Sequence, residues 1–337
     1  MLICTYICPV KKLIEKIKRL KRIVRAVYVR KLIHLSRRIT LPGFDGVSLW
    51  EILFFLGWTI RRGLLATRAS SLAFHFFLAM IPFGLVMVIV TAYVPYFDLE
   101  NDILPVFSVF IPETIFNQFV GNLDEFHHST VNSLISYGFL LALYFSSNGF
   151  TVLIKSFNAS RVRFEKRNWW STKITSVVFV FLIISAVLAL VIIVLFERKL
   201  LNYWAEHSVF IAENLNGIFS ISTFIFVGVM LYFAVATIYY FGPSNRKEFR
   251  FFSAGSTTAT ILIVLISELY SFYIQKFAKY DELYGSLGTI MMLLLWIYLI
   301  SFVLLLGFEL NASIHGALKK KQLDRLAQIQ ERYEEEF

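Results

Sequence analysis

The residues of this chain that could do chemistry are the polar side chains that interrupt its long apolar stretches. Ser71 and His75 follow Arg68 by three and seven residues, a spacing that aligns all three on one face of a helix. Four more residues keep a helical spacing in the next apolar stretch: Tyr144, Asn148, Thr151 and Lys155. An ionisable group in hydrocarbon is costly and usually faces a bundle interior or a wet cavity, so the pattern predicts a polar lining.

A carboxylate and an amide, Glu309 and Asn311, interrupt the last apolar stretch. At 1.5 Å of rise per residue, His75 and Asn148 lie roughly 10 Å from the cytoplasmic ends of their helices, and Glu309 lies nearer the same surface. We therefore predict a polar vestibule open to the cytoplasm, in which Arg68 pairs with Glu309. The alternative is that these side chains sit at helix ends beside headgroups or make packing hydrogen bonds.

These residues do not form a catalytic constellation. A zinc or di-metal hydrolase needs several converging ligands, whereas only His127 and His128 are adjacent among the six histidines. The chain has no phosphate-binding G-x-x-x-x-G-K-[ST] loop, no H-E-x-x-H and no G-x-S-x-G. We predict that the protein is not an enzyme and has neither a metal site nor a cofactor.

The composition is typical of a membrane protein. Hydrophobic residues make up 57% of the chain and charged residues only 17%, whereas a soluble domain carries about a quarter charged residues. The net charge of +10 lies beside apolar stretches, where anionic lipid headgroups are the expected partners. No basic stripe alternates with base-stacking aromatic residues, so we expect no nucleic-acid binding.

The positions of Lys and Arg predict the topology. The 86 residues from Ala69 to Ile154 contain neither. Six apolar stretches can each cross a hydrocarbon core of about 30 Å as a helix. They are Ser70–Tyr93, Leu134–Leu153, Ile174–Phe196, Ile218–Phe241, Phe251–Ile274 and Leu287–Ala312. With both termini inside, 29 of the 33 basic residues lie on the cytoplasmic side, as the positive-inside rule requires. The prediction is an all-α, polytopic membrane protein with six transmembrane helices and cytoplasmic termini.

Three regions follow from these boundaries: a basic extension over 1–44, a membrane domain over 45–316 and a charged cytoplasmic tail over 317–337. The segment Lys11–Arg38 suits an amphipathic helix on an anionic membrane surface, with a solvated helix as the alternative. Leu49–Ile60 is too short to span and predicts a short interfacial helix. We also expect amphipathic helices in the outer loop 95–133, and spans three and four are nearly featureless, as lipid-facing helices should be.

Several motifs occur in the order found in one known family. The sixth span carries Tyr284-Gly285-Ser286-Leu287-Gly288-Thr289, Leu295-Trp296-Ile297-Tyr298 and Leu306-Gly307-Phe308-Glu309-Leu310-Asn311. Earlier motifs are Ala69-Ser70-Ser71-Leu72-Ala73-Phe74-His75 with Pro82, Ser147-Asn148-Gly149-Phe150, and Gly242-Pro243-Ser244-Asn245 with Gly255. Over about residues 45–316 the chain resembles the YihY/BrkB family of bacterial inner-membrane proteins, formerly labelled ribonuclease BN.

The resemblance implies a six-span protein of the bacterial cytoplasmic membrane without a settled activity, connected with the cell envelope and proposed to transport. The former ribonuclease label is judged a misassignment, since no metal-ligand cluster accompanies it here. The motif residues with an expected structural role are Pro82, Tyr284, Gly285, Gly288, Trp296, Tyr298 and Gly307.

Three functions remain open from the sequence. The first is a transporter-like protein that moves a lipid or amphipathic anion for the envelope, because a basic cytoplasmic rim accompanies polar helix faces. The second is a cation/proton antiporter that uses Glu309, because buried acids serve proton relays. The third is a scaffold that binds envelope-assembly proteins through its outer loops and contacts anionic headgroups through its basic N-terminus.

Overall fold

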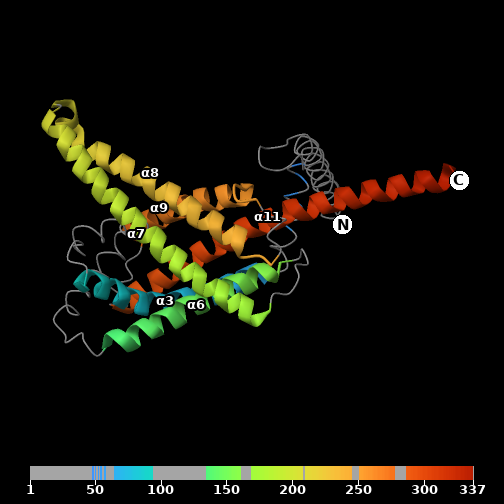
Figure 1. Cartoon of the computed structure of the whole chain (residues 1–337), viewed down its shortest axis with the longest axis horizontal. Helices are drawn as coiled ribbons and strands as arrows, with labels where there is room; N and C mark the ends of the chain where they lie inside the picture. Colours follow the sequence, from blue (N-terminus) through green and yellow to red (C-terminus); the bar gives the residue numbers. More distant parts are fainter. Residues whose placement is uncertain are drawn as a thin grey trace, which may run out of the picture. The chain divides into compact units, whose positions relative to one another are not determined.

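The computed structural model describes residues 48, 50, 52, 54, 57, 64–93, 134–160, 168–207, 209–244, 250–277 and 286–336. Within them the chain forms six long helices and no strand (Figure 1). The helices are α3 (Leu64–Tyr93), α6 (Leu134–Asn158), α7 (Trp169–His207), α8 (Val209–Phe241), α9 (Ala254–Phe277) and α11 (Ser286–Glu336).

Each helix overlaps one of the six predicted apolar segments, so the all-α class and the positions of the helices are confirmed. Four of them, α7, α8, α9 and α11, are long and apolar enough to cross a membrane in the part of the chain that is described. The count of six spans and the cytoplasmic location of both termini stay predictions. The Lys11–Arg38 segment and the 95–133 loop lie outside the described residues.

The chain divides into two compact units, one formed by Thr59–Ala312 and the other by Met1–Trp58 with Ser313–Phe337. The larger unit contains five of the helices and the first half of α11. In the smaller unit, α11 continues as a helix to Glu336 through residues that the sequence assigns to the charged tail. All polar clusters described below lie within Thr59–Ala312.

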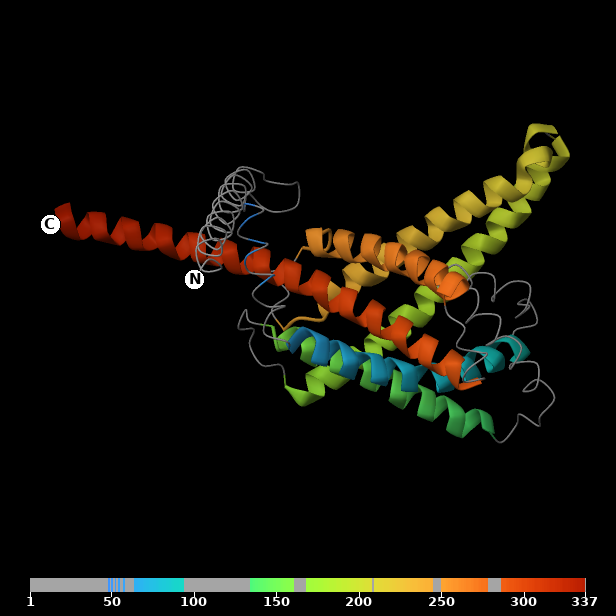
Figure 2. The same cartoon turned by 180° about the vertical axis from the view of Figure 1, so that it is seen from behind.

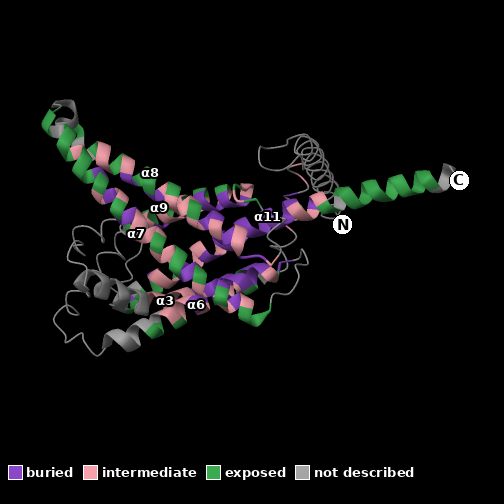
Figure 3. Cartoon of the chain, viewed as in Figure 1, coloured by how far each residue is buried: buried purple, intermediate pink, exposed green. Residues whose placement is uncertain are grey.

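In the larger unit, α3 packs along α6, and α7 forms an antiparallel hairpin with α8 (Figures 1 and 2). The first half of α11 supplies the centre of the buried core, to which four other helices contribute (Figure 3). The core includes Leu65 and Leu72 of α3, Leu153 and Phe157 of α6, Tyr239 of α8, Ala259 of α9 and Phe308 of α11. Phe157 stacks on Phe308 with ring centroids 4.0 Å apart. In a membrane, helices associate through dispersion forces and close packing rather than through the exclusion of water.

The crossing of α9 and α11 depends on two glycines. A Cβ atom added at Gly307 would lie 2.6 Å from the Tyr239 hydroxyl and 2.7 Å from the Ala259 Cβ. Gly255 faces the backbone of Gly307 directly. Small residues at helix contacts let backbones approach closely in membranes, which gives Gly307 the structural role expected from the sequence.

The outward faces of this unit are apolar. Exposed large side chains line α7, α8 and α9, among them Ile192, Phe196, Phe224 and Ile261. Exposed apolar area of this extent is unusual on a soluble monomer and is the surface that a lipid bilayer covers. Trp169 and Trp170 are exposed at the start of α7, where an interfacial aromatic belt is expected.

Candidate functional site

The first polar cluster joins α3 to α11. Arg68 Nη2 donates to Glu309 Oε1 over 2.6 Å, and Arg68 Nη1 donates to the Ser156 carbonyl over 2.7 Å. Ser160, two residues beyond the end of α6, donates its hydroxyl to Glu309 Oε2 over 2.8 Å. The Glu309 side chain is 3% exposed. The predicted pairing of Arg68 with Glu309 is confirmed, and both carboxylate oxygens have donors, as a buried charge requires.

The second cluster joins α9 to α11 through Asn311. Asn311 Oδ1 accepts from the Gly255 backbone N–H over 2.7 Å, and Asn311 Nδ2 donates to Ser253 Oγ over 2.8 Å. The N–H of Gly255 belongs to the first turn of α9, where no carbonyl of the same helix is available to it. Asn311 therefore caps α9, which is a structural use of the amide.

The third cluster lies between α6 and α7 and centres on Lys173. Its Nζ donates to Asn148 Oδ1 over 2.7 Å and to Ser147 Oγ over 2.9 Å. The Tyr144 ring lies under the cation, with its centroid 5.1 Å from Nζ, within the range of a cation–π contact. Among the described residues no carboxylate pairs with Lys173. In the described part of the chain, the groups that hold this cation are all neutral.

The Lys173 side chain reaches away from the nearer end of α7. Thr151 bonds to Ser176, and Phe150 contacts Phe179, so the two helices run antiparallel with 151 level with 176. Lys173 lies three residues closer than Ser176 to the start of α7. Its ammonium nevertheless binds Asn148, which lies three residues further than Thr151 from the end of α6 that faces the start of α7. A lysine near a helix end normally extends toward the surface. Lys173 is half-buried, and it instead carries its charge along α6, away from the nearer end of α7.

The remaining predicted site residues have local contacts or face outward. Thr151 Oγ1 donates to Ser176 Oγ over 2.9 Å within the α6–α7 contact. His75 Nδ1 lies 2.8 Å from the Ser71 carbonyl of its own helix. Ser71 and Lys155 are exposed.

The predicted vestibule residues thus fall into separate groups. Arg68 joins Glu309, Tyr144 and Asn148 join Lys173, and Asn311 contacts α9. A single vestibule that contains them all stays a prediction.

The motif residues mostly serve packing. Trp296 donates its indole N–H to Ser267 Oγ over 3.3 Å, and Gly288 is buried near the start of α11. The Tyr298 ring packs against the core and contacts Phe302. Pro82 lies within α3, whereas Tyr284 and Gly285 lie outside the described residues.

Sequence reasoning missed Lys173 and Ser160. Both lie in the cytoplasmic loop that the sequence predicts between Leu153 and Ile174, because the predicted third span begins immediately after the lysine. The prediction that spans three and four are nearly featureless is wrong for the third, since α7 begins at Trp169 and its first turns bury Thr172, Thr175 and Ser176. The two tryptophans before Lys173 were the available signal, because such residues mark a membrane interface.

No cluster of metal ligands occurs in the described part of the chain. No group of three or more His, Cys, Asp and Glu side chains is placed there to hold an ion.

Comparison of the sequence with known proteins identifies a family and several relatives. A sequence model of the family described as "Virulence factor BrkB" matches residues 60–330. The chain is similar to the ribonuclease-like protein YfkH of Bacillus subtilis, with 28% identity over 273 residues, 80% of this chain and 95% of the relative. It is 26% identical over 280 residues to a UPF0761 membrane protein of Photobacterium profundum, 80% of this chain and 82% of that protein. A UPF0761 membrane protein of Psychromonas ingrahamii is 25% identical over 283 residues, 81% of this chain and 90% of that protein. No solved structure matches the chain.

Proposed function

Because the chain belongs to the BrkB family of membrane proteins, we propose that it moves phospholipids or other amphipathic anions across the bacterial cytoplasmic membrane for the cell envelope. The observation that carries the proposal is the position of Lys173. Its ammonium is turned away from the nearer end of α7 and is held by the neutral oxygens of Asn148 and Ser147.

The cost of this cation argues that it has a use. Insertion scales give a lysine at the centre of a membrane helix about 2.5–3.5 kcal/mol of unfavourable free energy, and Lys173, one turn from Trp169, bears part of that cost. A purely structural contact could be made without charge, for example by glutamine. An ammonium that has no carboxylate partner among the described residues can stabilise a phosphate that leaves the headgroup region and enters hydrocarbon, where its passage is otherwise unfavourable.

The location of the cluster suits a lipid that enters from the bilayer. Tyr144 is 56% exposed and Ile174 is 63% exposed, so the α6–α7 contact borders the outer surface of the bundle. Trp169 and Trp170 stand at the same end of α7. A headgroup can therefore reach Lys173 while its acyl chains stay in the bilayer, and the path needs no catalytic group or nuclease chemistry.

The ion pair has a different task in this proposal. Both oxygens of Glu309 are occupied by Arg68 and Ser160, which suits a structural link between helices. A cation/proton antiporter would need this carboxylate to exchange protons during transport. The scaffold hypothesis places the activity in the 95–133 loop and in protein partners, and it requires no transport.

Lipid scrambling in proteoliposomes tests the proposal. A fluorescent phospholipid is quenched from outside with wild-type protein, empty vesicles, Lys173→Gln and Lys199→Gln. Lys199 is the matched control, because it is an exposed lysine on the same helix. We expect quenching beyond half with wild type and Lys199→Gln, and a rate about tenfold lower with Lys173→Gln, equivalent to about 1.4 kcal/mol in the barrier.

Two results would count against the proposal. The first is quenching that stalls at half in vesicles that contain correctly folded wild-type protein. This result would exclude lipid scrambling and would leave scaffolding and ion exchange as the possible functions. A proton flux that needs Glu309, measured with an internal pH dye against Glu309→Gln, would favour the antiporter.

A further inference from the structure

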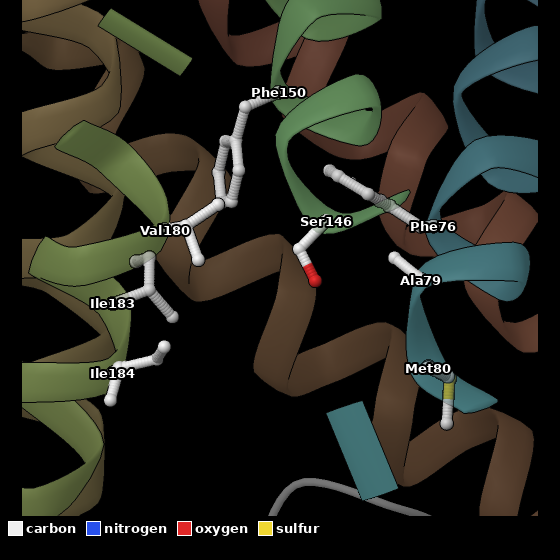
Figure 4. A pocket seen from close by; sticks show the side chains of 8 residues that line it. All are labelled: Phe76, Ala79, Met80, Ser146, Phe150, Val180, Ile183 and Ile184. Carbon is white, nitrogen blue, oxygen red and sulfur yellow. The ribbon is translucent and has the colours of Figure 1, made fainter. Parts of the chain in front are cut away.

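An open hollow of about 220 Å³ lies between α3, α6 and α7 (Figure 4). Ala79 of α3 and Ile183 of α7 enter it from opposite sides, and Ser146 of α6 projects between them. Phe76 of α3 and Val180 of α7 also line the hollow. Apart from Ser146 the lining side chains are apolar, so the hollow offers little to a polar solute.

The hollow continues the α6–α7 contact that holds Lys173. Val180 and Ile184 follow Lys173 by seven and eleven residues, which places them on the same helix face about 10 and 16 Å further along α7. On α6, Ser146 directly precedes Ser147, whose hydroxyl accepts from Lys173. A cation and an apolar hollow therefore lie in sequence along one helix pair.

Gly149 shapes one wall of this hollow. A Cβ atom at Gly149 would come within 2.9 Å of Phe76 Cδ1. The missing side chain lets the Phe76 ring lie against the α6 backbone and keeps α3 and α6 close together. The hollow is thus bounded by a close helix contact on one side and by branched residues of α7 on the other.

We propose that this hollow and Lys173 together bind one anionic phospholipid, with an acyl chain in the hollow and the phosphate on the Lys173 ammonium. The inference rests on the proposed function, for which it names the cargo class and the site. The charge complementarity comes from Lys173, which uses its N–H groups on neutral oxygens. An ammonium gains more from a phosphate oxygen than from a neutral acceptor. In a bilayer the natural occupant of an open apolar space is a hydrocarbon chain.

Photocrosslinking tests this arrangement directly. The full chain is placed in phosphatidylcholine nanodiscs with phosphatidylglycerol that carries a diazirine in one acyl chain. Labelled peptides are mapped by mass spectrometry, with diacylglycerol bearing the same chain as the uncharged probe. The variants are Lys173→Gln, Lys173→Arg and Ala79→Leu, and the controls are Lys199→Gln and Ala66→Leu, both at exposed positions. Thermal unfolding of each variant identifies those that fail to fold.

We expect phosphatidylglycerol to label the α7 segment that contains Val180 and Ile183. Labelling should fall about tenfold in Lys173→Gln, the loss expected for one hydrogen bond between charged groups. It should recover in Lys173→Arg, fall in Ala79→Leu because the added side chain fills the hollow, and stay unchanged in both controls. Diacylglycerol should label the segment weakly and equally in wild type and Lys173→Gln.

Labelling of this segment that is equal in wild type, Lys173→Gln and Ala79→Leu would overturn the inference, whatever the scrambling assay gives. Equal labelling by diacylglycerol and phosphatidylglycerol would overturn the phosphate contact. Labelling with the expected dependence, in a protein that scrambles no lipid, would establish the site and end the proposed transport function.

Discussion

Arg68 Nη2 lies 2.6 Å from Glu309 Oε1, which joins two residues 241 positions apart in the sequence. The contact ties the first turns of α3 to the central helix α11. Ser160 completes it from the segment after α6. Three elements of the bundle therefore meet at one carboxylate that is almost fully buried, and the stability of the bundle should depend on that link.

Replacing both partners of this pair should cost less stability than the sum of the two single replacements. Arg68→Gln or Glu309→Gln alone leaves an uncompensated buried charge, for which we expect a loss of about 3–5 kcal/mol. The double variant should recover about 0.5–3 kcal/mol relative to the sum of the singles. Unfolding in detergent, followed by circular dichroism, measures all four proteins. Additive losses would contradict the coupling.

Gly307→Ala should destabilise the crossing of α9 and α11. The added methyl group meets the Tyr239 hydroxyl and Ala259, so repacking should cost about 1–3 kcal/mol. Gly228→Ala in α8 is the matched control, because a Cβ atom there meets nothing within 4 Å. The same unfolding measurement compares them. Equal stability of the two variants would show that the glycine contact is not needed.

Tyr239→Phe should remove one buried hydrogen bond without disturbing the ring packing. The Tyr239 hydroxyl donates to the Leu304 carbonyl over 2.5 Å and is fully buried. We expect a loss of about 0.5–1.5 kcal/mol in unfolding free energy. Tyr203→Phe, at a position 59% exposed, should be neutral, and an equal loss there would indicate an effect unrelated to the hydrogen bond.

Cysteine labelling should settle the topology. In a background without Cys4 and Cys8, Ser129→Cys should react with an impermeant maleimide from outside intact cells. Ser244→Cys should react only after permeabilisation, because the positive-inside pattern places residue 244 in the cytoplasm. Lys319→Cys should behave like Ser244→Cys. The opposite result would invert the orientation, and different sides for residues 244 and 319 would change the number of spans between them.

Much of the fold could be predicted from local pattern. Each of the six helices overlaps a predicted apolar stretch, and the ends shift mainly where a helix continues into charged residues, as α11 does through Lys319 to Glu336. Apolar length alone is a poor guide to where a helix ends, since polar residues extend a helix as readily outside the bilayer. Because a predicted span ends where a charged residue occurs, the predicted third span begins at Ile174 and omits Lys173, which belongs to α7.

The sequence by itself determined the membrane class and the helices, which follow from hydropathy and helical periodicity. It also predicted the pairing of Arg68 with Glu309, because a buried charge needs a partner. Only the tertiary structure decided how the other polar residues combine. Asn148 and Asn311, which appear equivalent as intramembrane amides, serve Lys173 and the first turn of α9 respectively. Such assignments depend on the axial register of one helix against another, and that register results from packing among residues far apart in the chain.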